Sequence, residues 1–230
     1  MPTIKNGLYF ADYVRRAFVP SLEFYRRIVM EKFLPSLSDE AITEESNQVE
    51  KEAFERMGRS VSPEDYDPGD YFESAFDEGL EFYQLMHDTR QGLVNGLAAA
   101  LYHLFEQQLC EFYRLGAWDK KAVLSGMEAE ARLRALGVDI AKFPEWASIN
   151  ELRLLTNCVK HAEGGSCEQL AALRPDLLER PTVGPRLRGP RPFVERPLSG
   201  DGVYFSVEEF NKMADRLKRF WEYISDQISE

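Results

Sequence analysis

The stretch from Tyr71 to Leu115 reads YFESAFDEGLEFYQLMHDTRQGLVNGLAAALYHLFEQQLCEFYRL and carries the strongest periodic pattern in this chain. Its apolar residues recur at spacings of three and four, which places them on one side of an α-helix. We expect either one long helix here or two helices broken near residues 89–92. The apolar positions are Leu80, Tyr83, Met86, Leu93, Leu97, Leu101, Leu104, Phe105 and Phe112.

Helical patterns also occupy most of the remaining chain, and only Val203–Phe205 resembles a strand. Ser206 with Glu209 forms a capping-box pattern at the start of the last helix, and Ser166 with Gln169 forms a similar one before a short helix. The further helices are expected at residues 9–33, 39–57, 120–136, 145–162, 166–173 and 207–227. The expected fold class is therefore all-α, an up-and-down helical bundle with short connections.

The chain of 230 residues has a formal net charge of −11, and nearly all of the imbalance lies in one segment. Asp39–Glu81 contains 15 acidic residues and three basic ones, whereas the rest of the chain contains 24 acidic and 25 basic residues. We therefore divide the chain into N-terminal helices with an acidic segment, residues 1–70, and a helical bundle, residues 71–230. A basic or antitoxin-like protein partner at residues 39–81 is one expectation, with the segment either imitating the charge of nucleic acid or covering the motif face of its own dimer.

A second biased segment, residues 174–197, contains six arginines and six prolines. Proline lacks a backbone donor and fixes φ, so this segment is expected to be an extended connector rather than a helix interior or a central strand. It is either a solvated linker or a basic arm. In the second case Arg186, Arg188 and Arg191 are the candidate RNA-binding residues.

The helix expected at residues 145–162 carries the candidate chemistry. At about 100° per residue, Arg153, Asn157, Lys160 and His161 share an arc opposite the apolar residues. His161 can exchange a proton near neutral pH, and the two cations can hold a phosphate. This set suits metal-independent cleavage of RNA, with the 2′-hydroxyl as nucleophile. An ordinary amphipathic helix shows the same stripe, and basic residues in a last turn favour the helix dipole in any case.

Part of the chain resembles the HEPN-type helical domains of prokaryotes. The resemblance lies in the run Asn157-Cys-Val-Lys-His161 followed by Gly164-Gly165-Ser166, then Leu170 and Arg174-Pro175-Asp176-Leu177. It extends to Leu101-Tyr-His-Leu-Phe-Glu106 and to the Phe220-Trp221 helix. It implies a bundle that dimerises, with the motif helices of two subunits meeting at a shared cleft. Many such proteins are RNases of toxin–antitoxin or anti-phage systems, and others are non-catalytic partners or regulators.

The sequence departs from the family's catalytic pattern directly before Asn157. The active motif has an arginine at that position, and this chain has Thr156. Arg153 lies on the same helical face, one turn before Asn157. Two functions stay open: a binding or regulatory component of a prokaryotic defence or toxin–antitoxin type system, and an active endoribonuclease that uses His161 with Asn157, Arg153 and Lys160. Glu106 is expected to support the site by pairing with Arg153 or Lys160.

The remaining features predict a cytoplasmic protein that works without a cofactor or metal. Cys110, Cys158 and Cys167 form no CxxC pair and are expected to be reduced thiols. His103 and Glu106 have no second copy with metal-ligand spacing, so no metal site is expected. No secretory signal is apparent at the N-terminus, and no apolar run approaches the length of about 18 residues that a membrane span needs.

Overall fold

The computed structural model describes residues 7–59, 68–117, 126–180 and 196–229. In these residues the secondary structure is helical apart from an isolated bridge between Arg196 and Asp201, which confirms the all-α fold class. The α-helices are α1 (Gly7–Tyr13), α2 (Val19–Ile28), α3 (Asp39–Arg59), α4 (Pro68–Ala117), α5 (Gly126–Ala135), α6 (Trp146–His161), α7 (Gly165–Leu173) and α8 (Val207–Ser229). Short π and 3-10 segments connect several of them: Val14–Phe18, Val29–Phe33, Leu34–Leu37, Ile140–Lys142, Pro175–Leu178 and Pro197–Ser199.

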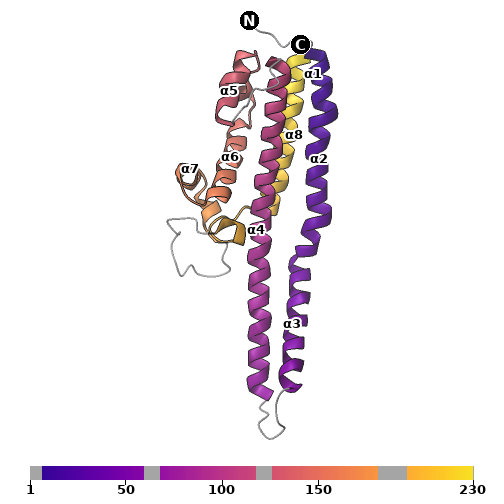
Figure 1. Cartoon of the computed structure of the whole chain (residues 1–230), viewed down its shortest axis with the longest axis vertical. Coiled ribbons are helices and arrows are strands. Elements are labelled where there is room, and N and C mark those ends of the chain that lie inside the picture. The colour runs from indigo at the N-terminus through magenta and orange to yellow at the C-terminus, as the bar shows by residue number, and fades with distance from the viewer. Residues whose placement is uncertain (1–6, 60–67, 118–125, 181–195, 230) are drawn as a thin grey trace.

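Helix α4 is the axis of the molecule. It runs without a break for 50 residues, about 75 Å at the usual rise per residue. The alternative of two helices broken near residues 89–92 is therefore wrong. Figure 1 shows α2 and α6 running opposite to α4, while α8 runs parallel to it, so successive long helices alternate in direction. None of the described helices is both long enough and apolar enough to cross a membrane.

The core of the bundle is aromatic and centres on Trp221 of α8, which is fully buried. Its ring lies against Phe18, Phe105 and Phe112, with centroid distances of 4.7 to 5.9 Å. The indole Nε1 donates to Gln108 Oε1 at 2.7 Å, which satisfies the polar atom of this buried ring. Val14, Phe18 and the buried residues of α2 belong to the same core, and α1 and α2 contact α8, so these contacts cross the division suggested at residue 70.

The segment before α8 lies directly on α4, and two polar side chains hold it there. Asn95 is fully buried, and its Nδ2 donates to the carbonyls of Pro197 and Val203, both at 2.8 Å. Gln91 Nε2 donates to Phe205 O at 2.9 Å. The carbonyls of Val203 and Phe205 thus accept hydrogen bonds from side chains of α4 rather than from a neighbouring strand. The expected strand at Val203–Phe205 is wrong, since these described residues form no strand.

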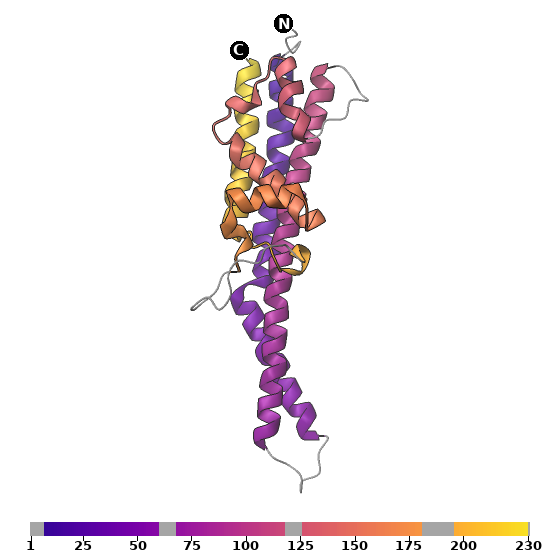
Figure 2. The same ribbon diagram turned by 90° about the vertical axis from the view of Figure 1, so that its left-hand side faces the viewer.

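Helices α3 and α4 form a hairpin that extends beyond the rest of the bundle (Figures 1 and 2). The contact surface between them contains small residues, with Ala53 and Ala75 each 1% exposed. Ser46 Oγ donates to Gly79 O at 2.7 Å, and a Cβ added to Gly79 would lie 3.0 Å from Glu50 Cβ. The two helix axes approach closely because these side chains are short. Between residues 43–59 and 68–82, the buried apolar side chains of the described residues are those of Ala53 and Ala75.

The start of α8 confirms one of the two expected capping boxes. Glu209 N donates to Ser206 Oγ at 3.0 Å, and Ser206 N donates to Glu209 Oε2 at 3.1 Å. The capping box expected at Ser166 is wrong. Helix α7 begins at Gly165, and Ser166 Oγ accepts a hydrogen bond from Asn157 Nδ2 at 3.3 Å instead.

Candidate functional site

The candidate site is a polar stripe on α6, which lies with α7 on the outside of the bundle (Figure 2). Most of α6 is buried: Leu152, Leu155 and Val159 are at most 3% exposed. Asn150, Arg153 and Asn157 are half-buried, while Lys160 and His161 are exposed. The four residues predicted to share a face therefore lie on the accessible side of α6.

A tight turn ends α6 immediately after His161. Ala162 has a φ of 60°, and Glu163 N donates to His161 O at 2.7 Å across it. This two-residue separation defines a γ-turn, and a positive φ in this class is strained for a residue with a Cβ. Gly164, with a φ of 112°, completes the reversal into α7. The turn fixes where the exposed imidazole projects from the helix end.

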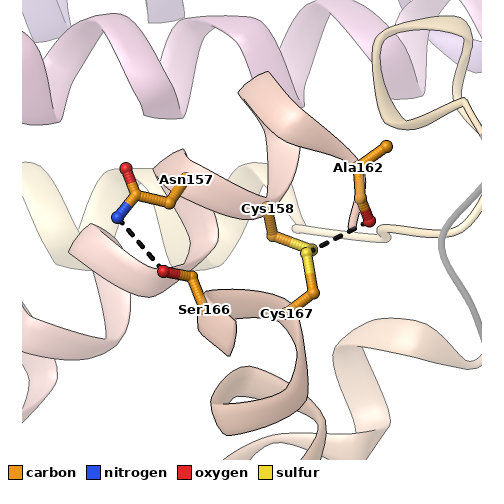
Figure 3. The surroundings of a disulfide bond; sticks show 5 residues. All are labelled: Asn157, Cys158, Ala162, Ser166 and Cys167. Carbon is orange, nitrogen blue, oxygen red and sulfur yellow. Dashed lines mark hydrogen bonds between the residues drawn. A yellow bond between two sulfur atoms is a disulfide. The ribbon is translucent and has the colours of Figure 1, made fainter. Parts of the chain in front are cut away.

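The side chains of the stripe bind their local neighbours rather than one another. Arg153 Nε donates to Asn150 Oδ1 at 2.8 Å, one turn toward the start of α6. Asn157 Nδ2 donates to Ser166 Oγ on α7, as Figure 3 shows. Within the described residues, the side chains of Lys160 and His161 have no hydrogen bond or ion pair. Within one chain the stripe is therefore a row of separate groups, two of them open to solvent.

Thr156, the residue directly before Asn157, faces the core. It is 1% exposed, and its Oγ1 donates to Leu152 O at 2.8 Å. An arginine here would place a guanidinium among buried side chains, at a high desolvation cost. Arg153 is consequently the residue that provides a guanidinium to the polar stripe.

Glu106 lies on α4 beside His103, with 3.3 Å between His103 Nδ1 and Glu106 Oε2. The pKa of the nearby Tyr102 phenol depends on charged groups of both α4 and α6. Burial and the charge of Glu106 raise the pKa of Tyr102, and the charge of Arg153 lowers it. Glu106 and Arg153 thus act on one buried phenol, while a direct pairing of Glu106 with Arg153 or Lys160 stays a prediction.

Sequence reasoning missed an open cleft of about 560 Å³ at the start of the stripe. Trp146, Asn150 and Arg153 contribute an aromatic ring, an amide and a guanidinium to its wall, and Trp146 stacks on Phe220 at 5.7 Å. The other lining residues are Glu130, Ala141, Phe143, Pro144 and Ala147. The same helical arc that contains Arg153 and Asn157 also contains Trp146 and Asn150, so extending the wheel by two turns would have found both.

Cys158 and Cys167 form a disulfide between the last turn of α6 and the start of α7 (Figure 3). The expectation that all the cysteines are reduced thiols is therefore wrong for this pair. Cys158 does point away from Asn157 into the core, as the helical wheel predicts, and is fully buried. Cys167 Sγ also lies 3.2 Å from Ala162 O. The crosslink closes the turn that follows His161.

The described ends of the Pro/Arg-rich connector are folded. Pro175–Leu178 is a 3-10 segment, and Leu177 is buried. Arg174 pairs with Asp176 at 2.7 Å, with Glu151 at 3.4 Å and with Glu209. The hydrogen bonds that Arg174 donates to Asp176 and Glu209 raise the pKa of Arg174, and its guanidinium lowers the pKa of Asp176. The predicted RNA contacts Arg186, Arg188 and Arg191 lie outside the described residues.

Comparison with protein-family models, with curated proteins and with solved structures found no match to this chain.

Proposed function

We propose that this protein is a binding or regulatory protein whose α3–α4 hairpin binds a basic protein partner. One observation carries the proposal: the acidic segment forms a hairpin that stands outside the bundle, where a partner can reach it (Figure 1). Among the described residues, only Asp39, Glu55 and Glu78 of its carboxylates form ion pairs, with Arg90, Arg59 and Arg56. The other described carboxylates of residues 39–81 form no ion pair within the described residues and can meet cations of a partner.

The proposal extends to the family and the setting. We propose a HEPN-like bundle that dimerises and acts in a prokaryotic defence or toxin–antitoxin type system. The motif residues Asn157, Lys160 and His161 at the end of α6 and the all-helical fold support it. We also propose a cytoplasmic location, although disulfides such as Cys158–Cys167 persist mainly in oxidising compartments.

The test of the hairpin's role measures how binding depends on charge. A fluorescent lysine-rich peptide of about 20 residues is titrated with the protein at increasing NaCl. Affinity is expected to fall with salt, because exposed charges are screened over about 10 Å at 0.1 M. The variant Glu73→Gln/Asp77→Asn/Glu81→Gln should bind more weakly. The matched control Glu31→Gln/Glu163→Gln/Glu168→Gln removes equal charge elsewhere and should bind as the wild type does. Equal loss in both variants would exclude a specific role for the hairpin.

A second candidate function is that of a metal-independent endoribonuclease. The exposed Lys160 and His161 beside Asn157 favour it, since a phosphate can reach all three. In this reaction His161 would take the proton of the 2′-hydroxyl as that oxygen attacks the phosphate, and the imidazolium would return a proton to the 5′-oxygen as its bond to phosphorus breaks. The cations Arg153 and Lys160 would stabilise the charge that develops on the phosphate.

The nuclease test compares His161→Ala with Glu163→Gln, which alters the neighbouring turn but leaves the imidazole. Both proteins are incubated with total RNA and with tRNA in the presence of a chelator. Loss of cleavage in His161→Ala alone is the expected result for an enzyme. Equal residual cleavage by both proteins and by wild type would exclude the imidazole as the catalytic group.

A further inference from the structure

The hairpin carries an apolar stripe that the bundle does not cover. Phe72, Phe76 and Leu80 follow one another at intervals of four residues on α4, and they are 60%, 49% and 42% exposed. Residues four apart differ by about 40° around a helix, so the three side chains fall within an arc of about 80°. Large apolar side chains grouped in this way mark a contact surface more often than isolated ones do.

A groove between the two helices continues this stripe. It has a volume of about 400 Å³ and is lined by Phe54 of α3 and by Phe72 and Ala75 of α4, together with Asn47, Glu50 and Lys51. The hairpin itself buries mainly short side chains along the contact between α3 and α4. Two helices therefore present a shallow apolar trough, of the kind into which an amphipathic helix lays its apolar face.

Acidic side chains border the trough. Glu73, Asp77 and Glu81 each directly follow one of the three apolar residues, so they form a parallel row about 100° further around α4. All three are exposed, and they have no ion pair within the described residues. Glu50 lies on the α3 side of the trough. Lys51 is the basic residue among the groove's lining residues, and it leaves the local balance strongly negative.

We propose that this trough, Phe54, Phe72, Ala75, Phe76 and Leu80, is the seat of a basic amphipathic helix from a protein partner. The inference rests on the proposed function and names the class of partner: apolar anchors at four-residue spacing, flanked by Lys or Arg. Charge complementarity selects this occupant. RNA and an anionic lipid surface would bring phosphates toward the carboxylate row, and a second copy of the chain would bring an identical carboxylate row.

The test uses two peptides of the same composition. One is a Lys-rich helix with Leu at positions i, i+4 and i+8. The other permutes these residues so that no apolar face forms. Both are titrated into the full chain by fluorescence anisotropy. We expect the amphipathic peptide to bind about tenfold more tightly than the permuted one.

Two variants show whether the stripe causes this difference. Phe72→Gln/Phe76→Gln should abolish the preference for the amphipathic peptide, while Phe24→Gln/Phe33→Gln should retain it. The control residues are each 56% exposed, similar to the pair on the hairpin, so both variants should stay folded, which circular dichroism checks.

Each outcome separates the inference from the proposed function. Equal affinity for the two peptides, with strong dependence on salt, overturns the apolar seat and leaves a purely electrostatic hairpin. A preference that survives Phe72→Gln/Phe76→Gln also overturns it. Absence of salt-dependent binding by either peptide overturns the proposed function as well.

Discussion

Asn95 shows how much of this fold depends on one buried amide. Its Nδ2 serves two carbonyls of the segment before α8, and its Oδ1 lies 3.4 Å from Phe205 N. Asn95→Asp keeps the shape of the side chain but turns a carboxylate oxygen toward those carbonyls. We expect a loss of about 2–4 kcal/mol in the free energy of unfolding, since buried polar groups lose their partners. Urea denaturation at pH 7 measures it.

The same chemical change at Asn47 provides the control for Asn95. Asn47 is exposed on α3, so Asn47→Asp adds a charge without removing a buried hydrogen bond. Its effect should stay within about 0.5 kcal/mol. Similar losses for the two variants would show that charge, rather than the buried amide, determines the result at residue 95.

Tyr25 gives a prediction for alkaline pH. Burial raises its pKa to about 12, and its hydroxyl donates to Leu97 O at 2.9 Å. The unfolded chain, with a tyrosine pKa near 10, loses this proton first, so the folded state binds more protons between about pH 10 and 12. The stability that this group contributes is therefore complete below pH 10 and is lost as the pH rises toward 12.

The variant Tyr25→Phe isolates that contribution. It should be less stable than wild type at pH 8, because the Leu97 carbonyl loses a donor, but its stability should fall less steeply above pH 10. Chemical denaturation at pH 8, 10 and 11 compares the two proteins. Parallel loss of stability in both proteins would contradict a raised pKa at Tyr25.

At the scale of elements, Gly92 explains how α4 can continue past the segment before α8. A Cβ at residue 92 would lie 2.0 Å from Leu198 O and 2.6 Å from Leu198 C. Gly92→Ala should therefore destabilise the protein by about 1–3 kcal/mol, although alanine is the better helix former. In α3 the matched change Gly58→Ala meets no atom within 4 Å and should stabilise by about 0.5–1 kcal/mol. Thermal unfolding of both variants tests the pair, and equal signs would refute the close approach at residue 92.

The disulfide between α6 and α7 makes a second prediction at this scale. It joins residues nine apart, and a loop of this size contributes about 2–3 kcal/mol in the chain-entropy model. Reductant should lower the stability of wild type by this amount and leave Cys167→Ala unchanged. Thiol counting in denaturant should find one reactive thiol, at Cys110, before reduction and three afterwards. Three thiols without reductant would show that the pair does not form.

Sequence patterns predicted elements better than contacts, and particular residues show why. The periodicity of residues 71–115 predicted the helix, although it buries Leu101, Phe105 and Phe112 and leaves Leu80 and Leu93 exposed. Ser206 with Glu209 was predictable because a capping box is a purely local hydrogen-bond pattern. Ser166 also has capping chemistry, but Asn157, nine residues away, binds its hydroxyl. Gly92 lies where the break was suggested, but it is needed for the close contact with Leu198. Leu198 lies more than 100 residues further along the chain, so no local pattern shows this contact.

The candidate site divides in the same way. The shared face of Arg153, Asn157, Lys160 and His161 follows from helix geometry and is present in the structure. The pairing of Cys158 with Cys167 and the cleft at Trp146 depend on how α6 meets α7, α5 and the 3-10 segment Ile140–Lys142. Local pattern contains no information on those approaches, so these features needed the three-dimensional structure.

At the scale of the whole molecule, the bundle and the hairpin should differ in stability. The bundle buries a continuous aromatic core around Trp221, whereas the outer hairpin buries mainly Ala53, Ala75 and other short groups along one contact surface. Local opening is cheapest where few apolar contacts are lost. Carboxylates concentrated on the hairpin also repel one another, and this repulsion weakens as salt screens it.

Hydrogen exchange measured by mass spectrometry tests this difference on the intact chain. Amides of residues 43–59 and 68–82 should exchange through local opening, much faster than those of residues 210–225 in α8, and 0.5 M NaCl should slow the hairpin selectively. Glu73→Gln/Asp77→Asn/Glu81→Gln should have the same effect as salt, because it removes charge from one row of α4. A hairpin that exchanges as slowly as α8 would mean that the whole chain unfolds as one unit. The contact between the short side chains of α3 and α4 would then stabilise the hairpin far more than its small buried side chains indicate. In that case the trough would already be rigid before a partner helix binds.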